Sequence, residues 1–385
     1  MAKRDMISLS FVTRSDRDTG NDVIRLTPPD IVCHRNYFYQ KCFTRDARRL
    51  IFGGAFDGHW NYYLLDLDAA EATQLTEGAG DNTFGGFLSA DDRALWYVKH
   101  QRELRRLDLA SLEERVVYEV DDAWVAYGTW VANSDCTALV GIEIKKRDWQ
   151  PLTDWQKFRE FYYTQPECRL IRIDLTTGER RVILQEKRWL GHPIYRPFDD
   201  ATVAFCHEGP RDVIDARMWL INEDGSAMRQ VRQHGPGESF THEFWVPDGS
   251  ALYYVAHQEG DPQRYLYAAD PQRYLCAADP ATLENRQLMA IPPCSHLMSN
   301  HDGSRVVGDG APHKTGDISL NDPYIWLFSL HDNTQRALCR HDTSWKVLDG
   351  DRQVTHPHPS FSPDEQWVLY TSDAEGMPAL YLAKV

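Results

Sequence analysis

The sequence predicts an all-β fold, a single seven-bladed β-propeller formed by residues 1–385. Three observations lead to this prediction. A short apolar segment that ends in a turn acid recurs seven times along the chain. Each repeat contains about four short strand-like segments within roughly 40–60 residues, which is typical of propeller blades. Finally, the last repeat stops after three such segments, and the missing one is found near the amino terminus.

The repeats begin near residues 34, 82, 127, 192, 242, 296 and 356. In the first repeat, residues 62–67 and 71–76 have the pattern of a third and a fourth strand. Residues 22–27 match the pattern of that fourth strand, so we expect them to complete the last blade and close the ring. Closure of this kind removes an exposed sheet edge. An open β-solenoid is the alternative.

Three insertions interrupt the repeats. Residues 145–168 carry aromatic and apolar side chains every three to four positions, which predicts a short amphipathic helix. Residues 308–322 lengthen the sixth repeat. Residues 261–269 are repeated almost unchanged at 270–278. Because nine is an odd number, only one copy can keep the inward and outward alternation of a strand, and we expect the other to form a loop.

Composition limits the partners. A net charge of −15 argues against binding to nucleic acid, which requires neutralisation of phosphates. The amino terminus is polar, and no apolar stretch reaches the length of a membrane span, so neither a signal peptide nor a membrane partner is expected. The eight cysteines show no paired spacing, which favours a reducing compartment, the cytoplasm. The sequence does not indicate protein partners.

Four repeats carry a histidine six or seven residues before the turn acid: His192, His242, His296 and His358. The turn acid is needed to form the turn in each repeat, whereas the propeller fold does not require a histidine at this position. The recurrence of histidine in four repeats therefore suggests a functional site. In a propeller, the beginning of each inner strand and the loop between the second and third strands lie on one face. We therefore expect these histidines to gather with residues 207–217 at one mouth of the central channel, a usual place for a ligand.

The segment Gln353-Val354-Thr355-His356-Pro357-His358 suggests a metal centre. In an extended chain, His356 and His358 project to one side. With His296 from the neighbouring blade and the Gln353 amide oxygen, they offer neutral nitrogen and oxygen ligands that suit a first-row divalent ion. The alternative is a pair of histidines that pack at the channel rim.

Two further residues suggest acid–base chemistry and anion binding. His242 is the best candidate for a general base, since an unperturbed imidazole titrates near neutral pH. Arg217, one blade away, has the planar fork that binds carboxylates, although it could instead pair with Asp215 or Glu243.

Five other residues are candidates for substrate subsites: His34, Arg35, His192, Arg196 and His207. Hydrogen bonds at the rim or solvated loops are the alternative for each of them. The chain lacks a Gly-x-Ser-x-Gly elbow, a His-Glu-x-x-His helix, a P-loop and a dinucleotide fingerprint.

Five motifs closely resemble the oligogalacturonate lyases of pectin-degrading bacteria: residues 33–43, 53–58, 191–197, 241–245 and 353–359. The resemblance covers essentially the whole chain. It implies a seven-bladed propeller that cleaves short oligogalacturonides in the cytoplasm, with Mn²⁺ or another first-row divalent ion. It also implies metal ligands at His296, Gln353, His356 and His358, a base at His242, and a carboxylate-binding arginine at Arg217.

The resemblance further implies β-elimination of digalacturonate and unsaturated digalacturonate to a 4,5-unsaturated uronate, which rearranges to a keto-uronate, within pectin catabolism. The duplication at 261–278 and a shortened 308–322 region depart from the family pattern. Two alternatives remain at this point. One is a non-catalytic interaction propeller of the periplasmic translocation type, and the other is a metal-dependent hydrolase.

Overall fold

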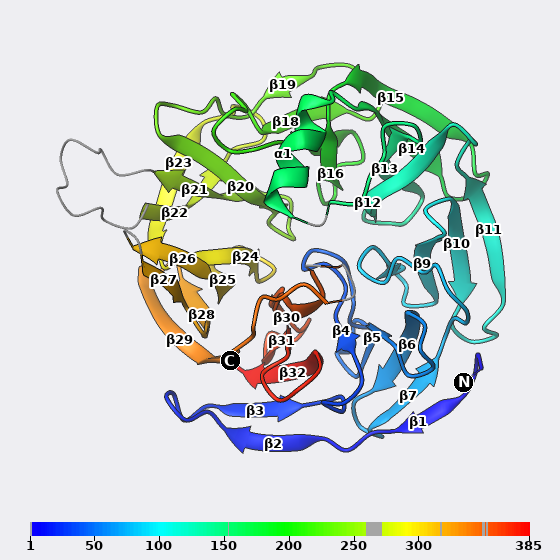
Figure 1. Cartoon of the computed structure of the whole chain (residues 1–385), viewed down its shortest axis with the longest axis vertical. Coiled ribbons are helices and arrows are strands. Elements are labelled where there is room, and N and C mark those ends of the chain that lie inside the picture. Colours follow the sequence, from blue (N-terminus) through cyan, green and yellow to red (C-terminus); the bar gives the residue numbers. More distant parts are fainter. Residues whose placement is uncertain (1, 153, 259–271, 316–317, 349–350, 352) are drawn as a thin grey trace.

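The computed structural model describes residues 2–152, 154–258, 272–315, 318–348, 351 and 353–385. Seven antiparallel sheets surround a central axis, and the first strand of each lies nearest to that axis (Figure 1). The fold is therefore the predicted seven-bladed β-propeller.

From the centre outward, blade one contains β4 (Cys33–His34), β5 (Arg49–Gly54), β6 (Asn61–Asp66), β7 (Glu71–Gln74) and β1 (Met6–Ser8). In the same order, blade two contains β8 (Phe87–Leu88), β9 (Ala94–Lys99), β10 (Glu103–Asp108) and β11 (Glu114–Glu119). Blade three contains β12 (Trp124–Ala132), β13 (Ala138–Lys145), β14 (Glu167–Asp174) and β15 (Arg180–Lys187). Blade four contains β16 (Leu190–Tyr195), β17 (Thr202–His207), β18 (Met218–Asn222) and β19 (Arg229–Gln230).

Blade five contains β20 (Glu238–Trp245), β21 (Leu252–Gln258), β22 (Gln272–Ala278) and β23 (Asn285–Ile291). Blade six contains β24 (Cys294–Ser299), β25 (Arg305–Gly310), β28 (Tyr324–Ser329) and β29 (Thr334–Arg340). Blade seven contains β30 (Ser360–Phe361), β31 (Trp367–Ser372), β32 (Ala379–Lys384), β3 (Asp22–Arg25) and β2 (Val12–Ser15).

Blade seven closes the ring as the sequence predicts. Strand β3 pairs antiparallel with β32, with Val23 opposite Ala383. Val23 is buried in a cluster that also contains Val307 of blade six and Val368 of blade seven. The amino-terminal segment does more than expected, because β2 adds a fifth strand to blade seven and β1 adds a fifth strand to blade one. Both outer strands are short and mostly exposed, so their sequences carry little of the apolar alternation that would predict them.

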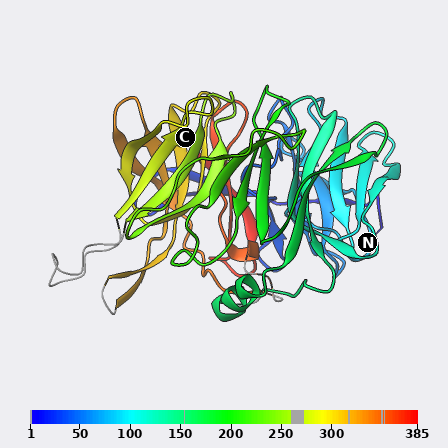
Figure 2. The same ribbon diagram turned by 90° about the horizontal axis from the view of Figure 1, so that it is seen from above.

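The insertions lie where the sequence places them. Helix α1 (Trp155–Tyr163) occupies the insertion of blade three; the Asp154 side chain caps it by accepting a hydrogen bond from the Lys157 amide, and Phe161 packs on Trp189. Strands β26 (Pro312–Thr315) and β27 (Ile318–Asn321) form a hairpin within blade six. Figure 2 shows helix α1 and this hairpin projecting from the same side of the ring. The second copy of the tandem duplication provides β22, whereas the first copy lies outside the described residues.

Candidate metal centre and active site

A recurring β-bulge explains the repeated histidine. The pairing between the first and second strands shifts in four blades, between Tyr127 and Val131, Gly191 and Ile194, Thr241 and Phe244, and Cys294 and Leu297. His192, His242 and His296 lie in three of these bulges, which leave extra residues unpaired and redirect side chains. His192 and His242 have φ angles of 47° and 56°, and His358, just before β30, has a φ of 49°. These left-handed conformations are costly for residues other than glycine. They also occur at ordinary turns of this chain, such as Ala47 and Ala70, so they support a site only together with the clustering of the side chains.

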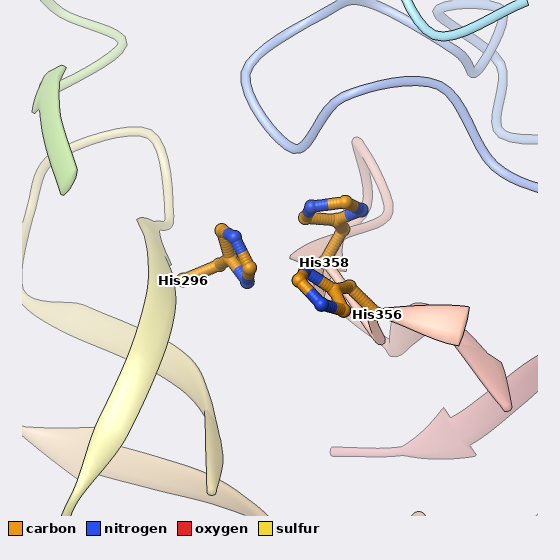
Figure 3. A group of neighbouring side chains, drawn as sticks. All are labelled: His296, His356 and His358. Atoms are coloured by element: carbon orange, nitrogen blue, oxygen red, sulfur yellow. The ribbon is translucent and has the colours of Figure 1, made fainter. Parts of the chain in front are cut away.

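The side chains of His296, His356 and His358 lie close together (Figure 3). One nitrogen of each lies within 4.8 Å of the others. The imidazole centroids of His296 and His358 are 4.1 Å apart, and those of His296 and His356 are 5.4 Å apart. Three imidazoles from two neighbouring blades therefore face a common point, as a metal site requires.

Two buried atoms in this region fit an additional partner. In the described part of the chain, Gln353 Oε1 and His358 Nε2 are buried and have no hydrogen-bond partner. Buried polar atoms of native proteins nearly always have partners. An amide oxygen and an imidazole nitrogen are ligands that a first-row divalent ion accepts. The donor set therefore fits a metal ion.

The backbone before His358 differs from the expected extended chain. Residues Gln353–Thr355 form the 3₁₀ turn η1, and the His356 amide donates to the Gln353 carbonyl over 3.0 Å. The left-handed φ of His358 then brings its imidazole back to within 5.7 Å of that of His356. The extended conformation expected from His356 to His358 therefore does not continue through His358, although the two imidazoles lie near one another.

Asp309, on β25, supports the histidine cluster and was not predicted. Its carboxylate lies 2.9 Å from His296 Nδ1 and accepts the backbone N–H groups of His296, at 2.6 Å, and of His358, at 3.2 Å. Asp309 is fully buried. A sequence signal did exist, since this acid follows the apolar residues Val306 and Val307 within strand β25.

His242 lies beside the cluster, with its imidazole centroid 5.0 Å from that of His296. Its Nδ1 is 2.8 Å from Thr241 Oγ1, which is also 2.8 Å from His257 Nε2. Its Nε2 is 3.4 Å from Ser295 Oγ. Burial, followed by the neighbouring His296 and Arg211, lowers the pKa of His242 well below its usual value. The imidazole is therefore neutral and able to accept a proton.

Arg217 is buried between two carboxylates. It donates from Nε to Glu243 and from Nη1 and Nη2 to Glu208, each over 3.0 Å, and from Nη2 to Glu243 over 3.3 Å. Burial alone would raise the pKa of Glu243, but Arg217 and then His192 lower it. Among the described residues, these bonds use four of the five N–H groups of a guanidinium. The remaining N–H is on Nη1.

His192 joins this group at its edge. Its Nε2 is 3.2 Å from Glu208 Oε1, and its side chain is 32% exposed. The Tyr39 hydroxyl lies 3.4 Å from its other ring nitrogen. Of the five candidate subsite residues, His192 is the one that the structure places against Arg217 and its carboxylates.

The other four candidates have internal partners. His34 is buried between Thr83 and the Arg35 carbonyl, and burial lowers its pKa to about 4. Arg35 is fully buried and donates to Ser360 and to the Asn36 carbonyl, which links blades one and seven. His207 lies between Arg188 and Glu186. Arg196 donates to the Gly249 carbonyl, at a turn on the opposite side of the ring.

An aromatic floor lies beneath the cluster. The Tyr37 ring centroid is 5.0 Å from that of His358 and 5.8 Å from that of His192, and Phe38 is 5.7 Å from His296. Gln40, three residues after Tyr37, bonds to the carbonyls of Gly85 and Trp130 in blades two and three. This segment therefore contacts the histidine cluster and also links blade one to blades two and three.

The comparisons with known proteins agree with one another. A family model described as oligogalacturonate lyase matches residues 1–385. The oligogalacturonate lyase of Dickeya dadantii (strain 3937) is 63% identical over 391 residues, which cover 100% of this chain and 98% of that protein. A solved structure of an oligogalacturonate lyase in complex with manganese has 65% identity and a TM-score of 0.94, covering 100% of this chain and 98% of that one. Another, from Vibrio parahaemolyticus, has 60% identity and a TM-score of 0.94, covering 100% and 99%.

No helix among the described residues is both long and apolar enough to cross a membrane.

Proposed function

Because this chain belongs to the oligogalacturonate lyase family, we propose that it cleaves short oligogalacturonides by β-elimination at the histidine cluster. In this proposal, His296, Gln353, His356 and His358 hold Mn²⁺, His242 is the base, and Arg217 binds the substrate carboxylate. One observation carries the proposal. Three imidazoles converge on a common point with a fourth, neutral imidazole beside them.

The chemistry begins with a weakly acidic proton. The C5 proton of galacturonate lies next to a carboxylate that is already negative, so its removal places more charge on the same group. When bound, Mn²⁺ supplies positive charge that neutralises this carboxylate and stabilises the enolate-like charge. The remaining N–H of Arg217 adds a fixed donor, which Glu208 and Glu243 hold in position.

His242 then accepts the C5 proton. Its Nε2 is the reactive nitrogen, because Thr241 Oγ1 occupies Nδ1. The electron pair of the C5–H bond forms the C4=C5 double bond, and the C4–O glycosidic bond breaks. The leaving sugar oxygen takes up a proton from solvent, and His242 releases the C5 proton to solvent, which returns it to the neutral form. The other product is a 4,5-unsaturated uronate, which rearranges to a keto-uronate. No water is consumed, in contrast to hydrolysis.

Family membership decides between the alternatives. It argues against a non-catalytic interaction propeller, because the two relatives are named lyases and match this chain over 98% of their length. It also argues against a hydrolase. We further propose that the enzyme works in the cytoplasm on imported oligogalacturonides. This proposal is supported by eight cysteines that are all free thiols, seven of them buried.

The direct test measures ultraviolet absorbance after digalacturonate is added to the purified protein. We expect a new absorbance from the conjugated unsaturated uronate. Incubation with EDTA should abolish it, and added Mn²⁺ should restore it, because the ion neutralises the substrate carboxylate. Sugar release without new absorbance would indicate hydrolysis, and activity that resists EDTA would contradict the metal centre.

Substitution of Arg35 tests whether this residue stabilises the fold or belongs to a substrate subsite. Arg35→Ala should lower the free energy of unfolding by about 1–3 kcal/mol, because Ser360 and a buried carbonyl lose a charged donor. The folded variant should keep its kcat/KM for digalacturonate. Denaturant unfolding and steady-state kinetics provide the two measurements. A large loss of kcat/KM at unchanged stability would instead place Arg35 in a substrate subsite.

A further inference from the structure

Asp309 lies on strand β25, directly opposite the β-bulge of strand β24. Cys294 pairs with Gly310 and Leu297 pairs with Gly308, so Asp309 is opposite the bulge that contains His296. A bulge leaves backbone groups without ladder partners. In blade six, the Asp309 carboxylate takes the place of a ladder partner, since its Oδ1 accepts the His296 backbone N–H over 2.6 Å.

The corresponding positions of the other bulged blades are not acidic. From the pairing registers, they are occupied by Gly141 in blade three, Phe205 in blade four and Tyr254 in blade five. The bulge itself therefore does not require a carboxylate. Blade six differs from these three blades in that its bulge presents a proposed metal ligand.

The second carboxylate oxygen connects two blades. Asp309 Oδ2 lies 2.9 Å from His296 Nδ1 and accepts the backbone N–H of His358 in blade seven over 3.2 Å. Backbone N–H groups can only donate, so both oxygens act as acceptors. His296 Nδ1 must then carry the imidazole proton, which leaves Nε2 as the nitrogen with a free lone pair.

We propose that Asp309 is a positioning residue of the metal centre. It selects the tautomer of His296 that presents Nε2 to the ion, and it fixes the His358 backbone relative to His296. The inference rests on the proposed function, because it takes these histidines as metal ligands. Carboxylates that orient ligating histidines in this way commonly account for about 10- to 100-fold in metal affinity.

Asp309→Asn is the sharpest change, because the amide has the same shape as the carboxylate. If its oxygen stays on the His296 backbone N–H, its NH₂ group faces His296 Nδ1 and the His358 N–H. His296 can accept from that NH₂ group only by moving its proton to Nε2, and Nε2 then no longer binds a metal. In the flipped orientation, the NH₂ group opposes a backbone N–H that cannot change. Both orientations weaken the site.

Two measurements test the proposal. Electron paramagnetic resonance of free Mn²⁺ during a titration gives the affinity, which Asp309→Asn should lower by about 10- to 100-fold. Long-range ¹H–¹⁵N spectra of the metal-free, ¹⁵N-histidine-labelled protein give the tautomer. The His296 signal is identified by its loss in His296→Gln. Wild-type His296 should carry its proton on Nδ1. In Asp309→Asn the proton should move to Nε2 when the amide oxygen stays on the His296 backbone N–H, and should remain on Nδ1 in the flipped orientation.

Glu143→Gln is the matched control. Glu143 is also a fully buried carboxylate on the second strand of a blade, where it accepts from Tyr118 and pairs with Arg169. Its substitution should destabilise the fold to a similar degree and leave Mn²⁺ affinity unchanged. The tautomer of His296 in the wild-type protein tests the role of Asp309 even if the Asp309→Asn variant does not fold.

The outcomes separate this inference from the proposed function. Wild-type Mn²⁺ affinity in Asp309→Asn, or an Nε2–H tautomer in the wild-type protein, would overturn the role of Asp309. If His296→Gln also binds Mn²⁺ like the wild type, the proposed metal centre is wrong and the inference falls with it. If His296→Gln weakens binding but Asp309→Asn does not, only the inference fails.

Discussion

Replacing His242 with alanine is expected to lower kcat on digalacturonate by about 10²- to 10⁴-fold, the usual contribution of a general base. The imidazole is half-buried and neutral, and its ring centroid lies 5.0 Å from that of His296. The other three imidazoles of the cluster are the proposed ligands of the ion, which leaves His242 as the proposed base. Steady-state absorbance assays measure the effect, and Mn²⁺ affinity should remain close to that of the wild type.

His242→Gln separates base catalysis from packing. Its amide can keep the hydrogen bond to Thr241 and fill much of the same space, but it cannot accept a proton at neutral pH. We therefore expect it to be as slow as the alanine variant. Rescue of turnover by glutamine would show that His242 only fills space. His59→Ala, which removes an exposed histidine from a loop of blade one, should leave kcat unchanged.

Replacing Arg217 with lysine is expected to lower kcat by about 10²- to 10³-fold, which is typical for the loss of one preorganised donor to developing charge. Lysine keeps the positive charge between Glu208 and Glu243, so the buried carboxylates still have a counter-charge. Lysine lacks the planar guanidinium group. In Arg217, four N–H groups of this guanidinium donate to Glu208 and Glu243 and so fix the direction of the fifth. Kinetics together with the midpoint of thermal unfolding check this result.

Arg169→Lys provides the comparison. Arg169 is also a buried arginine that contacts two carboxylates, those of Glu143 and Asp121, but it lies in blade three. Its substitution should shift the unfolding midpoint by an amount similar to that of Arg217→Lys and should not change kcat. If both variants lose activity to the same extent, the loss reflects general destabilisation and Arg217 has no particular role.

The sequence predicted the ring well because each blade repeats a strong local pattern. The missing fourth strand of blade seven was found in residues 22–27 by the same pattern, and β3 confirms it. The outer strands β1 and β2 were missed because exposed strands at a sheet edge need no apolar alternation. Repeat position also identified His296 and His358, since both occupy the point where the inner strand departs from regular pairing.

Other parts of the site depend on contacts that spacing does not reveal. Arg35 and His34 have the residue types of a binding site, but they are buried between blades and contact internal groups. Asp309 and Glu208 were missed for a different reason. Each follows an apolar run, and its role depends on a residue of the neighbouring strand or loop in the same blade, His296 for Asp309 and Arg217 for Glu208. Pairwise geometry of this kind is fixed by the tertiary fold.

The closure of blade seven has a consequence for biosynthesis. Strand β3 leaves the ribosome early and can pair with β2, but its other edge has no partner until β32 has emerged at the far end of the chain. His356 and His358 belong to this same late blade. Contacts between segments so distant in sequence form slowly and late. A stalled or prematurely terminated chain can therefore contain six blades of strands and still lack two of the three clustered histidines. Lyase activity is therefore expected only from chains in which the last blade has been synthesised.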